Sequence, residues 1–286
     1  LSAFWGDPPT AAAQLIASGN LDYLVGDYLA EVTMCLLTKA RQRDPALGYV
    51  PDFVSSVFKP LLPDILAQGV KVLTNAGGLD PIRLKTVLDN HAASVADSLP
   101  RLPRIAVVYG DDVVDILDDL RPLFRPVSTA GEPDSLPPTH TPPMSANVYF
   151  GATGLAMALD AGADFVVTGR CVDSALVLAA LMSAFAWSPH DYHKLSAGSL
   201  AGHILECGAQ STGGNFTDWK ASASAGPHNC SWANIGFPIA EVWPDGRFVI
   251  TKPPHTGGLV TVGTVSEQIV YEIADPAAYI LPDVVC

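Results

Sequence analysis

Four short apolar segments of the sequence each end in glycine and polar residues, within residues 22–31, 70–78, 105–112 and 164–173. The carboxyl ends of parallel strands meet at one edge of a sheet, so these side chains would lie together if the segments are neighbouring strands. Each segment alone has a simpler interpretation, in which glycine eases a turn and Asp or Asn caps a helix. The residues concerned are Asp27 and Glu31, then Asn75, Gly77 and Gly78, then Asp111, and finally Arg170 and Asp173.

Asp27 and Glu31 are the candidates for acid–base chemistry after the first segment. A carboxyl group in an apolar crevice at a strand end can have a raised pKa, which suits a proton donor. Asn75, Gly77 and Gly78 would offer amide groups to a carbonyl or phosphate oxygen. The third glycine of a dinucleotide-binding motif is missing, as is the Lys-Ser/Thr pair of a phosphate-binding loop.

Arg170 lies between an apolar strand segment and an apolar helical segment. A guanidinium group in such partly desolvated surroundings needs an anionic partner. Two partners fit the sequence: Asp173, in a structural ion pair, or the carboxylate of a substrate held by two parallel hydrogen bonds. Asp111 and Asp173 are placed with Arg170 in substrate binding.

The densest polar run is at residues 202–215, where His203 and Glu206 share one helix face at a spacing of three residues. They form either an acid–base pair or part of a metal site. The sequence offers only two or three candidate ligands here, which favours the acid–base pair. We therefore expect no metal or other cofactor. Local capping of the helix end is the structural alternative. Further substrate contacts are expected from a second glycine-rich turn and a loop lysine, which are Thr212, Gly213, Gly214, Asn215 and Lys252.

The elements that must position these residues alternate between short β-branched runs and longer helical patterns. Strands are predicted at 22–25, 70–74, 105–109 and 164–168, and a hairpin with an Asp-Gly turn at 239–251. This alternation predicts an α/β fold with a mostly parallel sheet, helices on both faces and a C-terminal β-hairpin, and favours a Rossmann-like open sheet over a barrel. Helices are predicted at 10–18, 28–43, 52–68, 81–99, 111–120, 147–161, 173–187, 196–210 and 265–273.

The chain of 286 residues is interpreted as one α/β domain of catalytic type, spanning 1–286, with a proline-rich excursion at 126–143 and a loop at 221–231. It begins with Leu1 and stops at Cys286 directly after an apolar run, so we expect a portion of a longer chain.

Composition narrows the possible partners. A net charge of −13, with no basic cluster longer than two residues, argues against nucleic acid and membrane surfaces. The longest apolar run is too short for a membrane span, which needs ~20 residues. Five cysteines without CxxC spacing indicate reduced thiols, as in the cytoplasm. Apolar types at 49% with charged types at 16% suggest a homo-oligomer.

Several long motifs together resemble the acyclic terpene utilisation (AtuA-like) family, over nearly the whole chain. They are FWGD at 4–7, DYLVGDYLAEVT at 22–33, TNAGG at 74–78, TGRCVDS at 168–174, GHILECGAQSTGGN at 202–215 and TKPPHTGG at 251–258. The resemblance implies metabolism of branched acyclic terpenoid acids or their CoA esters. It assigns no reaction to individual residues, so the roles given above come from local chemistry.

The leading hypothesis is an enzyme, of lyase or isomerase type, that moves protons during hydration or dehydration, isomerisation or cyclisation of a small branched or terpenoid acid or acyl-CoA. Asp27, Glu31, His203 and Glu206 are its acid–base candidates. One alternative is metal-assisted hydrolase or lyase chemistry through His203 and Glu206. The other is a non-catalytic subunit or scaffold domain, in which the glycines only serve turns.

Overall fold

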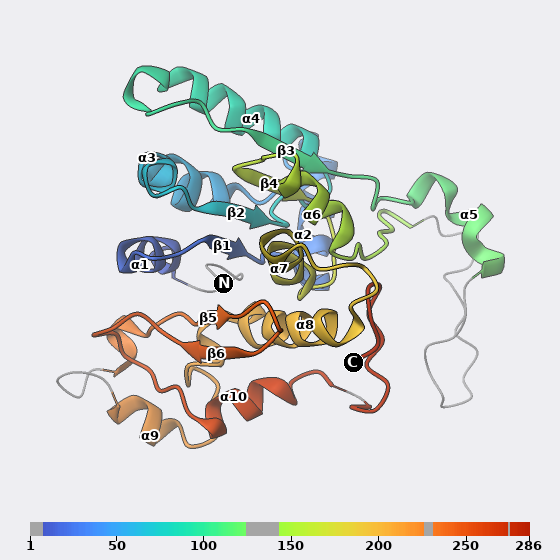
Figure 1. Cartoon of the computed structure of the whole chain (residues 1–286). Helices are drawn as coiled ribbons and strands as arrows, with labels where there is room; N and C mark the ends of the chain where they lie inside the picture. Colours follow the sequence, from blue (N-terminus) through green and yellow to red (C-terminus); the bar gives the residue numbers. More distant parts are fainter. Residues whose placement is uncertain (1–7, 124–142, 226–230, 274) are drawn as a thin grey trace.

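The computed structural model describes residues 8–123, 143–225, 231–273 and 275–286. It has a four-stranded parallel sheet with helices on both faces, and a separate two-stranded antiparallel hairpin (Figure 1). The predicted open α/β sheet and the C-terminal hairpin are therefore confirmed, and the sheet does not close into a barrel. The excursion predicted at 126–143 lies outside the described residues, apart from its last position.

The parallel sheet has the strand order β1-β2-β4-β3. Its strands are β1 (Tyr23–Gly26), β2 (Lys71–Thr74), β3 (Ile105–Val108) and β4 (Phe165–Thr168), close to the segments predicted from sequence. In β4 every residue is buried, as expected for an inner strand that is covered on both faces.

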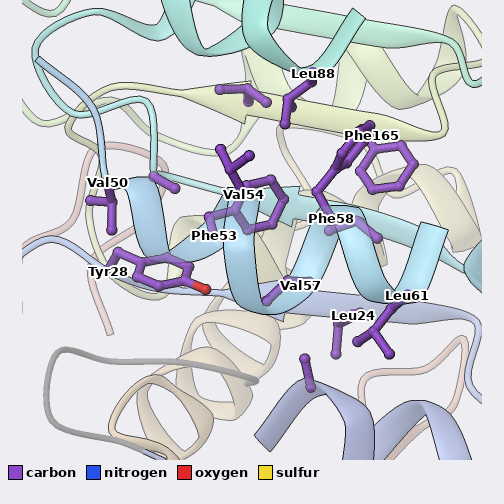
Figure 2. Packing of buried hydrophobic residues seen from close by; sticks show 14 of the residues in the cluster. Leu24, Tyr28, Val50, Phe53, Val54, Val57, Phe58, Leu61, Leu88 and Phe165 are labelled. Atoms are coloured by element: carbon purple, nitrogen blue, oxygen red, sulfur yellow. The ribbon is translucent and has the colours of Figure 1, made fainter. Parts of the chain in front are cut away.

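Alternate strand residues enter two separate cores, one on each face of the sheet. Leu24, Val72 and Phe165 pack with helices α1, α3 and α4 on the first face. There Phe58 meets Phe165 edge to face, with ring centroids 5.0 Å apart (Figure 2). Val25 and Val166 point the other way, against α6 and α7. This period of two is what a strand buried on both sides requires.

The connecting helices follow the predicted alternation. Helix α4 begins as predicted, with the Asp80 side chain accepting a hydrogen bond from the Arg83 amide and Pro81 in the first turn. A π-helical stretch, Phe53–Phe58, precedes α3. The helices are α1 (Ala11–Ser18), α2 (Glu31–Arg43), α3 (Lys59–Gln68), α4 (Pro81–Ser94), α5 (Leu117–Leu120), α6 (Thr153–Asp160), α7 (Ala175–Phe185), α8 (Tyr192–Glu206), α9 (Trp219–Ser224) and α10 (Val262–Ile269).

Three local predictions are wrong. The segment predicted as a helix at 147–161 becomes helical only at Thr153, because Asn147 and Phe150 form bridges with Asp112 and Cys171. The same bridge delays the helix predicted at 111–120, which begins with a short 3-10 turn. The loop predicted at 221–231 overlaps the end of α9.

The hairpin consists of β5 (Ile239–Val242) and β6 (Phe248–Thr251). Gly246 in its turn has φ +90°, a conformation that favours glycine. A residue far away in the sequence anchors the hairpin: the Trp187 indole donates a hydrogen bond to the Pro244 carbonyl at 2.9 Å. In Figure 1 it lies beside α8, on the far side of β1 from β2.

Across the described parts of the chain, no helix has the length and apolarity that a bilayer crossing requires.

Candidate functional site

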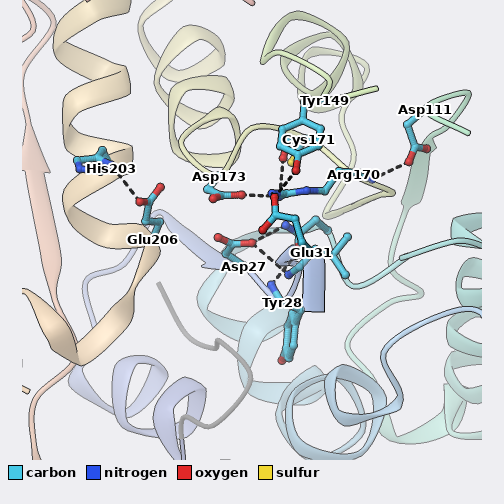
Figure 3. Close-up of polar contacts among 12 residues, drawn as sticks. Asp27, Tyr28, Glu31, Asp111, Tyr149, Arg170, Cys171, Asp173, His203 and Glu206 are labelled. Carbon is cyan, nitrogen blue, oxygen red and sulfur yellow. Dashed lines mark hydrogen bonds and ion pairs between the residues drawn. The ribbon is translucent and has the colours of Figure 1, made fainter. Parts of the chain in front are cut away.

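Two adjacent strands of the parallel sheet lead into helices on opposite faces at its carboxyl edge. After β2 the chain continues into α4 on the first face, and after the neighbouring β4 it continues into α7 on the opposite face. Adjacent strands whose connections diverge in this way mark the ligand-binding position of open α/β sheets. The residues after β1, β2 and β4 meet there (Figure 3).

Asp27 and Asn75 are joined directly across this edge. The Asn75 Nδ2 donates a hydrogen bond to Asp27 Oδ1 at 2.5 Å, and its Oδ1 accepts one from the Tyr28 amide at 2.7 Å. Both side chains are buried. The Tyr28 amide can only donate, so the Asn75 side chain must turn its oxygen toward Tyr28 and its nitrogen toward Asp27. Asp27 Oδ1 is therefore the acceptor in this pair.

Burial raises the pKa of Asp27 well above its ordinary value, and the nearby charge of Asp173 raises it further. The hydrogen bond from Asn75 acts in the opposite direction but does not offset burial. Asp173 has a raised pKa as well, again from burial, although Arg170 lowers it in part. Each of these two carboxyl groups is therefore protonated more readily than it would be in water.

Arg170 is buried and pairs with the protein's own carboxylates. Its Nη1 donates to Asp173 Oδ1 at 2.5 Å and to the Cys171 carbonyl at 2.9 Å, and its Nη2 lies 3.5 Å from Glu31 Oε1. Among the described residues, its Nε has no hydrogen-bond partner. The structural ion pair with Asp173 is thus present, and one buried donor of the guanidinium group remains unused.

Tyr149 is a site residue that the sequence did not single out. Its ring covers Arg170, with the guanidinium carbon 4.0 Å from the ring centroid, and its hydroxyl donates to Glu31 (Figure 3). That hydrogen bond lowers the pKa of Glu31, whose side chain is 76% exposed. Burial and the same bond raise the pKa of Tyr149. Together Tyr149 and Glu31 form the exposed side of the Arg170 environment.

Asp111 supports the turn after β4 and is near Arg170 only through the backbone. Its Oδ2 accepts hydrogen bonds from the Arg170 amide at 2.8 Å and from Asn147 Nδ2 at 2.9 Å. A β-carbon on Gly169 would lie 2.3 Å from Asp111 Oδ1, so only glycine fits there. Burial raises the pKa of Asp111. This arrangement orients the turn that carries Arg170.

His203 and Glu206 reach the same region from α8. Both are buried, and His203 Nδ1 lies 2.9 Å from Glu206 Oε1, with the geometry of an ion pair rather than of a linear hydrogen bond. Burial raises the pKa of Glu206 to about 7. Burial lowers the pKa of His203, but the contact with Glu206 outweighs it and raises the pKa overall. The Glu206 carboxylate points toward Asp173 and Asp27 (Figure 3).

Gly77 and Gly78 follow Asn75 in the turn after β2 and allow close backbone packing. A β-carbon on Gly77 would lie 2.4 Å from the Thr168 carbonyl oxygen, and one on Gly78 would lie 2.7 Å from that of Gly48. The Gly78 amide donates to the Asn75 carbonyl. These contacts hold Asn75 in place, which is the structural role that glycine turns also predict.

The remaining predicted substrate contacts lie elsewhere, in loops on both sides of the hairpin that meet near Gly236. Thr212 Oγ1 donates to the Gly236 carbonyl at 2.6 Å. Lys252 Nζ donates to the Thr256 carbonyl at 2.8 Å, and its alkyl chain passes beside Gly236. The residues concerned are Thr212, Gly213, Gly214, Asn215 and Lys252. In the described structure, none of them forms a hydrogen bond or ion pair with Arg170.

In the described segments, no group of three or more His, Cys, Asp and Glu side chains is arranged so that it could hold a metal ion. Cys171 is fully buried near Asp27 and Asp173, and burial raises the pKa of its thiol. Burial and the charge of Glu206 also raise that of Cys207. Neither thiol has the lowered pKa of a reactive nucleophile.

A groove of about 770 Å³ lies beside the sheet, between β1 and β5. Its walls come mainly from apolar residues of β1, α7 and the hairpin, and it lies apart from the Arg170 group. Val25 and Leu205 line the groove and are close in sequence to Asp27 and Glu206.

The fold and the site define an α/β protein with a cluster of acidic side chains around a buried arginine at the carboxyl edge of its sheet. A family model described as acyclic terpene utilisation family protein AtuA matches residues 1–286. The chain therefore belongs to the acyclic terpene utilisation family, as the sequence motifs predict. No curated protein and no solved structure gives a significant match.

Proposed function

We propose that the protein is an enzyme of acyclic terpenoid metabolism that works by proton transfer, in hydration or dehydration, isomerisation or cyclisation. Its substrate would be a branched or terpenoid carboxylic acid or its acyl-CoA. The family supports the metabolic role. The observation that carries the chemistry is the grouping of three carboxyl groups beside Arg170 (Figure 3). Asp27 and Glu206 are buried and Asp173 is partly exposed, and the pKa of each is raised.

Asp27 is the proposed proton donor. Asn75 donates to Oδ1 of Asp27, so in this proposal the acidic proton is carried by Oδ2. The fixed Asn75 amide group thus determines which oxygen of Asp27 donates. A protonated carboxyl group in an apolar site can give a hydrogen bond or a proton to a substrate oxygen or double bond at neutral pH. Glu206, with a pKa of about 7, and its partner His203 would relay or receive the proton.

Glu31 is the complementary base in this proposal. The Tyr149 hydroxyl lowers its pKa, so the carboxylate is ionised at neutral pH. Its contact with Arg170 is long, at 3.5 Å, and its side chain is exposed, so it can move aside when a substrate enters. Arg170 would then bind a substrate carboxylate or thioester oxygen with the donors that Glu31 releases.

The alternatives receive less support. A metal-assisted hydrolase would need a third ligand in addition to His203 and Glu206. These two side chains already pair with each other, at 2.9 Å. A scaffold domain would not need buried carboxyl groups with raised pKa values, such as Asp27 and Glu206, because each one costs stability when it ionises. The same proposal includes a cytoplasmic homo-oligomer with reduced thiols; the four cysteines within the described residues are free.

Deuterium incorporation tests the proposal. The protein is incubated in D₂O with geranic acid or its CoA thioester, and the mass of the product is measured by mass spectrometry. We expect added deuterium or added water with the native chain, and loss of both with Asp27→Asn. Asp245→Asn, in the exposed hairpin turn, is the matched control and keeps full activity. Unchanged acid and unchanged thioester with the native chain would refute the proposal.

A further inference from the structure

The end of helix α10 contacts one of the two ring nitrogens of His203. The Nε2 of His203 lies 3.2 Å from the carbonyl oxygen of Ile269, which is the last residue of α10. The final carbonyl groups of a helix have no donor within the helix, so this oxygen is available to a side chain. A carbonyl oxygen can only accept, and Nε2 must therefore carry a hydrogen. In the neutral ring the other nitrogen, Nδ1, then has only a lone pair.

Nδ1 is the ring nitrogen that faces Glu206. It lies 2.9 Å from Glu206 Oε1, and both side chains are buried (Figure 3). Among the described residues, Nδ1 has no hydrogen-bond partner. Lone pairs on Nδ1 and Oε1 would repel each other at this distance, so a proton on either atom stabilises the contact. A proton can thus pass between these two atoms while Nε2 keeps its hydrogen.

Gln268 holds α10 in place beside His203. Its side-chain Nε2 donates a hydrogen bond to the His203 carbonyl at 3.0 Å, and the residue is only 2% exposed. Two consecutive residues of α10 therefore contact the same residue of α8, Gln268 at its backbone and Ile269 at its ring. A missing Gln268 donor would leave the position of the Ile269 carbonyl less well determined.

Helix α8 is itself packed tightly at the neighbouring residue. A β-carbon on Gly202 would lie 2.6 Å from the carbonyl oxygen of Ser174, which directly follows Asp173. The ring of Tyr279 packs edge to face against His203, with ring centroids 6.0 Å apart. His203 is therefore held between α10 and the turn that carries Asp173, and it has little freedom to change its orientation.

The charged groups around the pair favour a proton on it. Burial raises the pKa of Glu206, and Asp173 and Glu272 raise it further, while His203 lowers it in part. Burial lowers the pKa of His203, but Glu206 and the backbone carbonyl of α10 outweigh burial. Two other titratable side chains near the pair have raised pKa values, chiefly from burial, and stay uncharged at neutral pH: Tyr279 and Cys207.

We propose that Gln268 and Ile269 are positioning residues, which keep the hydrogen of His203 on Nε2 so that Nδ1 exchanges one proton with Glu206 Oε1. The step moves a single proton between these two atoms and leaves the Nε2–H bond intact. The benefit to catalysis rests on the proposed function, in which Glu206 takes part in proton transfer. The position of the hydrogen on His203 does not depend on any reaction.

Nitrogen-15 NMR of the histidine rings in the native chain, without substrate, tests the hydrogen position. The His203 signals are identified by their absence from His203→Asn. At pH values between 4.5 and 8 we expect Nε2 to keep its hydrogen, while Nδ1 loses its proton as the pH rises. In Glu206→Gln this loss should occur at lower pH, because the negative partner of the ring has been removed.

A neutral ring with its hydrogen on Nδ1 would overturn the proposal, because Ile269 would then not determine the protonated nitrogen. An unchanged titration midpoint in Glu206→Gln would overturn it as well, because Nδ1 would not be coupled to Glu206. Neither measurement requires turnover. Absence of turnover in the native chain would therefore count against the proposed function and not against the hydrogen position.

Gln268→Met tests the positioning role, with Glu267→Gln as the matched control on the same helix. Methionine has a similar size but cannot donate to the His203 carbonyl, so we expect some neutral rings with hydrogen on Nδ1. We also expect kcat to fall by up to about 100-fold with an unchanged KM. Glu267 accepts from the Thr217 amide at 2.8 Å, and glutamine can still accept there, so the control keeps the native values.

A native ring spectrum in Gln268→Met would overturn the positioning role, whether or not kcat falls, because the side chain would then not act through His203. If this variant does not fold, the spectra of the native chain and of Glu206→Gln decide.

Discussion

The Nδ2 of Asn75 lies 2.5 Å from Oδ1 of Asp27, so the side chain that follows β2 holds the side chain that follows β1. Asp27 is thereby kept rigid in a buried position, where burial raises its pKa well above the ordinary range. An acid in this state is ready to donate a proton but costs stability when it ionises.

Asp27→Asn is expected to abolish turnover without unfolding the protein. The amide oxygen can still accept from Asn75, while the acidic proton is lost, and general acid catalysis is worth about 10²–10⁴-fold. Thermal unfolding at pH 7 should occur at the same or a higher temperature than in the native chain, because a buried ionisable group has been removed. A variant that keeps more than about a tenth of the turnover would remove Asp27 from the mechanism.

The pH dependence of stability should report Glu206. Its pKa rises from an ordinary 4.5 to about 7 on folding. Its contribution to the free energy of unfolding is therefore fully present below pH 4.5 and is lost as the pH rises through 7. This shift corresponds to about 3 kcal/mol. His203, whose pKa is also raised, acts in the same direction.

Urea unfolding of the native chain and of Glu206→Gln, at several pH values between 4.5 and 8, measures this contribution. The free energy of unfolding of the native chain should fall more steeply with pH than that of the variant. Parallel curves for the two proteins would show that Glu206 has an ordinary pKa in the folded state.

Much of the carboxyl-edge cluster follows from the sequence, because it depends on a local rule. Asp27, Asn75, Arg170 and Asp173 each follow an apolar segment, and parallel strands bring such positions together. The hydrogen bonds among them depend on side-chain orientation, which strand spacing does not determine.

Tyr149 could not be placed in the same way. Its segment has a helical pattern, and it is extended only because Asn147 and Phe150 pair with residues distant in sequence. Thr212 and Lys252 carry the same kind of glycine-rich signal as Asn75, yet they lie by the hairpin entry, where their contacts depend on how the hairpin packs. Non-local packing, rather than residue type, separates the two groups.

Tyr149→Phe and Tyr149→Ala should separate the two contacts of that side chain. The Phe variant loses the hydrogen bond to Glu31 and raises the pKa of that carboxyl toward its ordinary value, while the ring still covers Arg170. The acidic limb of a pH–rate profile should therefore move to higher pH with Phe. The Ala variant should also raise KM, because the cover over Arg170 is lost. An unchanged acidic limb in the Phe variant would show that Glu31 is not the base.

Asp164 provides a contrast at the opposite edge of the sheet, where it should affect stability and not turnover. It lies at the start of β4 and accepts from Lys71 Nζ at 2.8 Å, from the Arg104 amide at 2.9 Å and from two nitrogens of Arg101. Burial raises its pKa, but these donors outweigh burial and hold it well below its usual value. Asp164→Asn should lower the free energy of unfolding at pH 7 by about 1–3 kcal/mol, because charged donors lose their acceptor.

The loss should shrink as the pH falls toward 2, since a group with a lowered pKa contributes stability above its unfolded value and loses it on protonation. Arg101→Ala, which removes one partly exposed donor, should cost less. Turnover per folded molecule should match the native chain in both variants. A turnover loss comparable to that of Asp27→Asn would mean that the amino edge of the sheet takes part in the reaction, contrary to the location of the acidic cluster.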